Sequence, residues 1–113
     1  MKKIEAFIRH ERLNAVRETL VEIGHRSMIN YDIWYRGTED EISRHQADGN
    51  SPLYSFMPKV KIELVVEDSA VPSIIDAISE SGHTGHIGDG KIFVLPVEEA
   101  MRIQTKETGD AIL

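Results

Sequence analysis

Apolar and polar residues alternate along residues 4–9 and again along residues 60–67. Because successive side chains of a strand point to opposite faces of a sheet, this period of two predicts two strands, each with one buried face. Residues 28–35 are rich in aromatic and β-branched side chains, and residues 92–95 form a short apolar run. These two segments also predict strands.

Two segments between these strands carry apolar residues at helical spacing. Along residues 11–23 they recur every three or four positions, and Gly24 follows as the expected C-terminal stop. Residues 71–81 show the same spacing, with Asp68 or Ser69 as the expected N-cap. Each segment therefore predicts an amphipathic helix.

The predicted elements follow the order βαββαβ. Two right-handed βαβ crossovers that share one sheet give the ferredoxin-like α+β fold, in which a four-stranded antiparallel sheet carries both helices on one face. The opposite face would be left apolar, and other copies of the chain are its simplest cover. With 113 residues, of which 41% are hydrophobic, residues 1–113 are expected to form a single domain.

Two segments have no sustained hydrophobic pattern. Residues 36–55 are mostly polar, and a loop of that length in a compact domain is usually functional or disordered. The tail, residues 98–113, is mixed and charged, with the pattern of a short helical turn at residues 98–101.

Charge and composition exclude several functions. The net charge of −6 and the absence of a basic stripe argue against nucleic acid as a partner. The chain has no cysteine, which excludes disulfides, thiolate metal sites and a cysteine nucleophile. No apolar run has the length of a signal or membrane-spanning segment, so we expect a cytoplasmic protein that does not insert into the membrane.

A glycine-rich segment, residues 84–91, precedes the last predicted strand. Gly85, Gly88 and Gly90 allow the backbone to turn tightly and to approach a ligand closely. Successive N–H groups in such a turn can form a concave anion site, to which Lys91 would add a positive charge. The segment matches neither the Walker A nor the dinucleotide-binding pattern. It predicts a phosphate-binding loop, with an ordinary glycine-rich connection as the alternative.

The five histidines raise the alternative of a metal site. His83 and His86 are close in sequence, His45 lies near Asp48, and imidazole and carboxylate groups suit transition metals. No His-x-His or His-x-x-x-His spacing on a predicted helix or strand supports such a site. Dispersed surface histidines are the commoner explanation, and no metal ligand is assigned.

Three motifs resemble the PII signal-transduction family. They are MKKIEA at residues 1–6, FMPKVKIE at residues 56–63 and TGHIGDGKIFV at residues 84–94. The resemblance covers almost the whole chain except residues 29–55. It implies a homotrimer of ferredoxin-like subunits that binds adenine nucleotides (ADP, AMP or ATP) in clefts between neighbours. It also implies that a long loop, here residues 36–55, regulates a membrane transporter or a metabolic enzyme.

The resemblance also implies which residues contact the nucleotide. The family's glycine loop wraps the phosphates. His86 stands where the family usually has a lysine, and Gln104 replaces one of two tail arginines, which leaves Arg102. Both changes remove positive charge, so ADP or AMP is expected to bind at least as well as ATP. The alternative is that Arg26 makes the lost contacts. The implied binding residues are Met28, Ile29, Lys59, Glu63, Gly85, His86, Ile87, Gly88, Asp89, Gly90, Lys91 and Arg102.

The loop departs further from the family pattern. Family members carry a glycine-rich, basic segment whose glutamine ligates magnesium and helps to hold 2-oxoglutarate, and residues 34–41 contain no such segment. Lys59 matches the family lysine that pairs with 2-oxoglutarate, but alone it is half of a site. Sensing of 2-oxoglutarate with magnesium and ATP is therefore in doubt. Ser51 and Pro52 stand where some members have a nucleotidylated tyrosine; Tyr54 lies close by.

Trp34 and Tyr35 open the loop, next to the acidic residues 39–41. Rigid, amphipathic side chains of this kind are typical of binding hot spots, so residues 34–55 are predicted to contact a partner other than the usual ammonium transporter. The alternative is that Trp34 ends the second strand and packs on the trimer face of the sheet.

The fold class alone does not separate a regulator from an enzyme. An acylphosphatase-like site would need an arginine and an asparagine around a phosphate loop near the first strand, and residues 10–12 do not supply them. A non-catalytic, nucleotide-responsive regulator is therefore expected. The alternatives are a weak ATPase or phosphate hydrolase, and a degenerate paralogue that acts in mixed trimers.

Overall fold

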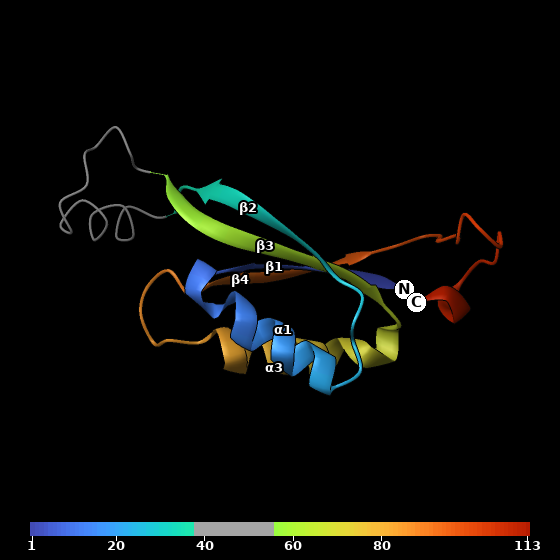
Figure 1. The fold of residues 1–113 in the computed structure, drawn as a ribbon, viewed down its shortest axis with the longest axis horizontal. Helices are drawn as coiled ribbons and strands as arrows, with labels where there is room; N and C mark the ends of the chain where they lie inside the picture. The colour runs from blue at the N-terminus through green and yellow to red at the C-terminus, as the bar shows by residue number, and fades with distance from the viewer. Residues whose placement is uncertain (38–55) are drawn as a thin grey trace.

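A computed structural model describes residues 1–37 and 56–113, so most of the loop expected at residues 36–55 lies outside the described residues. One sheet with the strand order β2-β3-β1-β4, antiparallel throughout, carries two helices on one face (Figure 1). This arrangement confirms the predicted ferredoxin-like α+β fold. The elements are β1 (Lys2–Ile8), η1 (His10–Arg12), α1 (Leu13–Glu22), β2 (Ile29–Tyr35), β3 (Met57–Val66), η3 (Asp68–Ala70), α3 (Val71–Gly82), β4 (Gly90–Pro96) and η4 (Asp110–Ile112).

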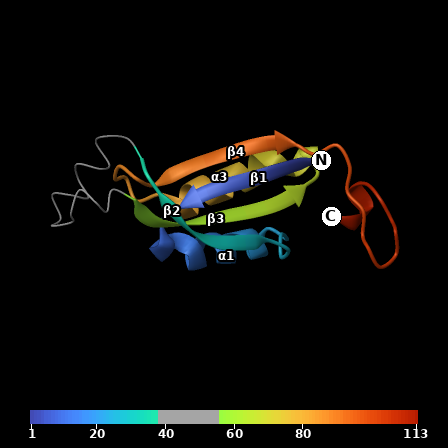
Figure 2. The same ribbon diagram turned by 90° about the horizontal axis from the view of Figure 1, so that it is seen from above.

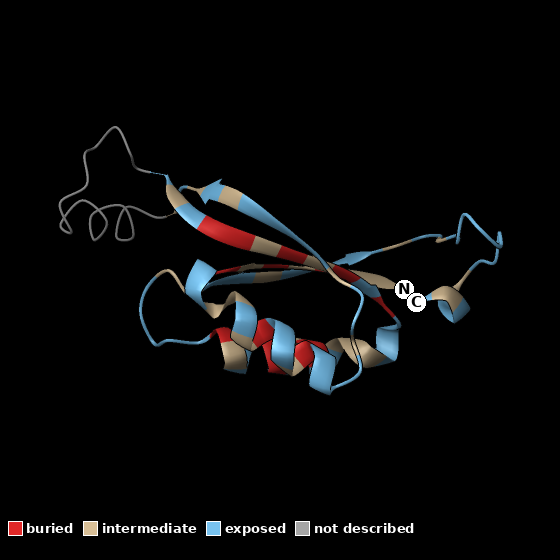
Figure 3. Cartoon of the chain, in the orientation of Figure 1, coloured by how far each residue is buried: buried red, intermediate tan, exposed pale blue. Residues whose placement is uncertain are grey.

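The core lies between the sheet and the two helices. Every second residue of β1 and of most of β3 is buried, as the predicted alternation requires, and Figure 3 shows the buried bands on both strands and on the helices. Strand β1 is central because it pairs with both β3 and β4 (Figure 2). The buried apolar residues are Ile4, Ala6, Ile8, Val16, Leu20, Val60, Ile62, Leu64, Val66, Ile74, Ala77 and Ile78.

The first helix ends as predicted at Gly24. This glycine has a φ of 97°, and its N–H donates to the carbonyl of Val21 at 3.0 Å. The N–H of His25 donates to the carbonyl of Leu20 at 2.9 Å. These two bonds form a Schellman motif, in which a left-handed glycine lets the chain satisfy the last helical carbonyls.

The N-cap predicted for α3 is wrong. The helix follows a 3₁₀ turn, η3, so Ala70 is the N-cap residue and no side chain caps the helix. Asp68 belongs to that turn, and its carboxylate lies 3.2 Å from the ammonium group of Lys2. Asp68 therefore links the turn to the start of β1 instead of capping α3.

The helical turn predicted at residues 98–101 is also wrong. Met101 forms a β-bridge with Thr108, and the N–H of Arg102 donates to the carbonyl of Glu107 at 2.9 Å. The tail is therefore a hairpin, which a sequence of this mixed character does not reveal. Residues of η4 then bring the chain back beside the end of the sheet where β1 begins (Figure 1).

The face of the sheet away from the helices was expected to be apolar, but the structure shows charged residues on it. Lys3, Glu5, Lys61 and Glu63 form a network at its centre, with N–O distances of 2.7–3.5 Å. Strand alternation identifies the buried face, but it leaves the chemistry of the opposite face open. Apolar side chains flank the network, among them Phe7, Tyr35, Phe93, Val65 and Leu95.

Candidate functional site

The glycine loop joins α3 to β4 and depends on backbone conformations that only glycine adopts easily. Gly85, Gly88 and Gly90 have φ values of 88°, 102° and 110°. A Cβ atom at Gly90 would overlap the carbonyl oxygen of Phe7, because β4 begins its pairing with β1 at this position. A glycine is therefore required here both by conformation and by space.

Asp89 organises the loop from within. Its carboxylate accepts hydrogen bonds from the N–H groups of Thr84, at 2.7 Å, and Gly85, at 3.0 Å, and also from the Thr84 hydroxyl. The Nε of Arg9 donates to the same carboxylate at 2.9 Å. Partial burial alone would raise the pKa of Asp89, but these hydrogen bonds outweigh it and hold the pKa well below its usual range. Asp89 is thus an ionised anchor of the loop.

Two cations hold the carbonyl groups of the loop. A guanidinium nitrogen of Arg9 donates to the carbonyl of Ile87 at 2.8 Å, and the Lys59 ammonium donates to the carbonyl of Gly88. Lys59 is only 6% exposed. No hydrogen bond between described residues uses the N–H groups of Ile87 or Gly88. The two cations bind the loop carbonyls, and N–H groups of the loop stay available. A loop with available N–H groups can bind an anion.

Arg9 contacts the loop, although no pattern in the sequence singled it out. It follows β1, whose residue Ile8 pairs with Gly90, and this register brings Arg9 next to the loop. Its position after a strand gave no signal without knowledge of the strand pairing.

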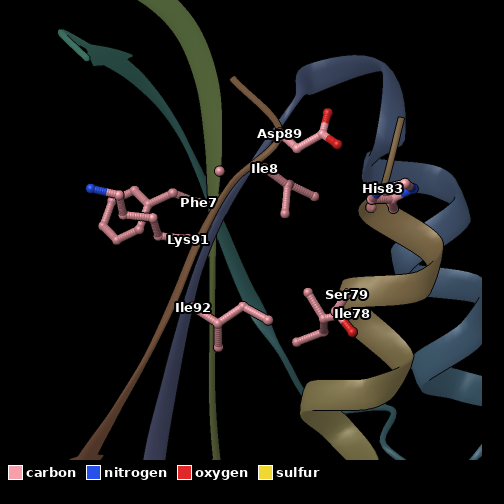
Figure 4. A pocket seen from close by; sticks show the side chains of 10 residues that line it. Phe7, Ile8, Ile78, Ser79, His83, Asp89, Lys91 and Ile92 are labelled. Carbon is pink, nitrogen blue, oxygen red and sulfur yellow. The ribbon is translucent and has the colours of Figure 1, made fainter. Parts of the chain in front are cut away.

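Figure 4 shows how the side chains at this end of the sheet divide between its two faces. Phe7 and Lys91, which are paired in register, point to one side of the strands. Ile8 and Ile92 point to the other side, toward α3. Lys91 therefore carries its charge to the open face of the sheet.

A cavity of about 300 Å³ lies between the strands and the end of α3, beside the loop (Figure 4). Its lining is mainly apolar and includes Ile8, Ile78 and Ile92. Its polar lining includes Asp89, which is held by Arg9 and Thr84, together with His83 and Lys91. A mainly apolar cavity that contains a carboxylate is a poor site for phosphate.

The remaining predicted binding residues lie far from the loop. Met28 and Ile29 stand at the start of β2, and Ile29 pairs with Glu63. Glu63 is four positions after Lys59 along β3, which at the rise of an extended strand is about 13 Å. Arg102 belongs to the tail beyond β4, and this tail lies at the opposite end of the molecule from the loop that joins α3 to β4 (Figure 1).

Two of these distant residues are already paired. The carboxylate of Glu63 lies 2.7 Å from the ammonium of Lys61 and accepts a hydrogen bond of 3.0 Å from the Tyr31 hydroxyl. The Lys61 contact is the main cause that lowers the pKa of Glu63. Arg102 lies 3.6 Å from the carboxylate of Glu107 in its own hairpin. The predicted binding residues thus form two groups, one at the loop end of the sheet and one toward its other end.

Trp34 does not pack on the open face of the sheet, contrary to one alternative from the sequence. Tyr35 occupies that face, with its ring 6.4 Å from the ring of Phe7. Trp34 points to the other side, beside His10 and Asp32, and is 73% exposed. It is therefore available to a partner.

Neither a metal centre nor a membrane span is found in the described part of the chain. Within residues 1–37 and 56–113, no three His, Cys, Asp or Glu side chains come together as metal ligands. His45 and Asp48 lie outside these residues. None of the described helices combines the length and the apolar character needed to cross a membrane.

Comparisons with known proteins identify the same family as the three sequence motifs at residues 1–6, 56–63 and 84–94. The family model described as nitrogen regulatory protein P-II matches residues 1–107. A nitrogen regulatory protein P-II from Azospirillum brasilense is 47% identical over 99% of this chain and 100% of its own length. The nitrogen regulatory protein P-II 1 of Escherichia coli is 41% identical over the full length of both chains. The crystal structure of Arabidopsis thaliana PII bound to citrate has a TM-score of 0.79 and 37% identity, covering 97% of this chain and 89% of that one.

Proposed function

Because this chain belongs to the nitrogen regulatory protein P-II family, we propose that it is a regulatory protein that binds an adenine nucleotide between neighbouring copies of a homotrimer. The observation that carries the proposal is the separation of the two groups of binding residues, the glycine loop with Lys59 at one end and Ile29, Glu63 and Arg102 toward the other. Two neighbours, arranged head to tail around a closed ring, would bring the glycine loop of one chain next to the second group of the other.

The glycine loop would bind the phosphates. Its N–H groups at Ile87 and Gly88 bind no other described residue, and Arg9 and Lys59 lie beside Gly88. Lys91 adds a charge on the open face. These groups offer directed donors and positive charge together, which is the combination that recognises phosphate.

The second group would bind the base. Ile29 is exposed and apolar, and Glu63 offers an acceptor for an amino group. A carboxylate at this position disfavours phosphate, so the two groups suit opposite ends of one nucleotide. Arg102 would reach the phosphates from the neighbour once it leaves Glu107.

We expect ADP or AMP to bind at least as tightly as ATP, because His86 and Gln104 add no fixed positive charge for a third phosphate. We expect no dependence on 2-oxoglutarate, since Lys59 already donates to the carbonyl of Gly88. Magnesium is also in doubt as a cofactor, because residues 34–41 lack the segment whose glutamine ligates it in the family. The Arabidopsis relative binds citrate, a carboxylate ligand, so citrate belongs among the ligands to be tested.

The protein would regulate a transporter or a metabolic enzyme by binding it through residues 34–55. Trp34, the first residue of this segment, is exposed, which supports a contact with another protein. Nucleotide binding can drive such a contact only if the nucleotide binds one arrangement of the segment more tightly than another. We further propose that the protein acts in the cytoplasm and does not catalyse a reaction.

Isothermal titration calorimetry with AMP, ADP and ATP, with and without magnesium, 2-oxoglutarate or citrate, tests the proposal. Light scattering would give the mass of the assembly, which should be three times the 12.8 kDa of the chain. A monomer, or a trimer that binds no adenine nucleotide, would contradict it. Turnover of ATP above background would favour the alternative of a hydrolase.

A further inference from the structure

A cavity of about 350 Å³ lies on the open face of the sheet, at the end farthest from the glycine loop. Ile29, Glu63 and Val65 form its sheet side. Its opposite side is formed by the last residues of the tail, Ile112 and Leu113. The two sides come from segments that lie far apart in the sequence.

The tail reaches this position through a hydrogen-bonded path. After the hairpin, the N–H of Gly109 donates to the carbonyl of Ala100 at 3.2 Å, and the left-handed φ of Gly109, 81°, turns the chain. The turn η4 follows, and the N–H of Leu113 donates to the carbonyl of Asp110 at 3.1 Å. Ile112 is therefore held at the cavity by backbone structure.

The cavity has the size and chemistry of a site for a flat heterocycle. Its volume falls in the range of small-ligand pockets, about 300–1,000 Å³. Apolar side chains line it on both sides, together with Lys3 and Glu63. The Glu63 carboxylate, which already accepts from Tyr31 and lies near Lys61, keeps further lone pairs to accept a hydrogen bond. Apolar faces with a few placed polar groups are typical of sites that bind and orient such ligands.

We propose that Ile112 and Leu113 form the outer wall of the base-binding half of the nucleotide site. This inference rests on the proposed function, and it adds two binding residues that no motif in the sequence indicates. Leu113 also lines a neighbouring cavity of about 440 Å³, together with Ser27 and Val65. Truncation of Leu113 would therefore open the base side toward that second cavity and leave the phosphate side unchanged.

The test compares the wild type with the double variant Ile112→Ala/Leu113→Ala by calorimetry, using ADP and inorganic tripolyphosphate as separate probes. Loss of apolar contact with the base should weaken ADP binding about tenfold or more, while tripolyphosphate binding stays within twofold. Ile103→Ala is the matched control, because Ile103 is in the same tail but 92% exposed. It should bind both probes as the wild type does.

A conservative variant and a folding check keep the outcome clear. Leu113→Met should retain most of the ADP affinity, and circular dichroism should show an unchanged fold for every variant. Equal weakening of both probes, unchanged ADP binding or tighter ADP binding in the double variant would overturn the inference alone. A wild type that binds tripolyphosphate but no nucleotide would overturn the proposed function as well.

Discussion

Arg9 and Asp89 form an ion pair, with 2.9 Å between Nε and Oδ1, that joins the end of β1 to the glycine loop. Both side chains are about one fifth exposed. Because the same guanidinium also holds the carbonyl of Ile87, Arg9 fixes the loop at two points. The conformation of the loop is therefore coupled to the central strand of the sheet.

Replacement of Arg9 by alanine should destabilise the protein and loosen the loop. Asp89 would lose one charged donor and Ile87 would lose its partner, so we expect the free energy of unfolding to fall by about 1–3 kcal/mol. Urea denaturation measures this change. Glu11→Ala is the control, because Glu11 lies 3.9 Å from Arg9 and is exposed, so its loss should change stability by less than about 0.5 kcal/mol. Equal effects would show that Arg9 acts only as a surface charge.

Acid should weaken the fold through Asp89. The folded pKa of this carboxyl lies below its unfolded value, so its stabilising effect is complete above about pH 4 and is lost as the pH falls through the folded pKa. We expect Asp89→Asn to be less stable than the wild type at pH 7, with the gap narrowing below pH 4. Urea denaturation at several pH values measures it. A constant gap from pH 7 to pH 2 would argue against an ionised anchor.

Alanine at Gly90 should be far more harmful than alanine at Gly24, although both glycines have left-handed φ values. The added Cβ at Gly90 would overlap the Phe7 carbonyl, whereas nothing lies within 4 Å of the corresponding position at Gly24. We expect Gly24→Ala to cost about 1 kcal/mol and Gly90→Ala to cost more than about 3 kcal/mol or to prevent folding. Thermal unfolding compares the two directly. Similar melting temperatures would show that strand β4 can shift to accept the side chain.

Mixed trimers would show whether neighbouring chains share each nucleotide site. Lys91→Glu should repel phosphate at the loop, and Ile29→Asp should impair the base side, so each homotrimer should bind ADP weakly. Refolding the two variants together should restore roughly a quarter of the sites, since random mixing pairs an intact loop with an intact base side that often. Calorimetric stoichiometry measures the recovery.

The control for this experiment mixes two variants with defects at the same end. Lys91→Glu and His86→Glu both alter the loop, and their mixture should recover no sites. Absence of recovery in the first mixture as well, with trimers confirmed by mass, would mean that each site is built within one chain.

The open face shows where reasoning from the sequence reached its limit. The alternation of β1 and β3 identified the buried face correctly, because apolar burial acts on each strand separately. The network of Lys3, Glu5, Lys61 and Glu63 depends on which strands are neighbours and in what register. The same limit explains why the tail hairpin was not predicted.

What the sequence determined by itself was the order of the elements, the helix-facing core, the glycine stop at Gly24 and the glycine loop, because each depends on local periodicity or on backbone freedom. Only the tertiary structure decided that Arg9 anchors Asp89 and that Lys59 holds Gly88. These contacts join residues 80 and 29 positions apart, which strand pairing brings together. Pairing across a sheet is a property of the whole chain, so no local pattern encodes it.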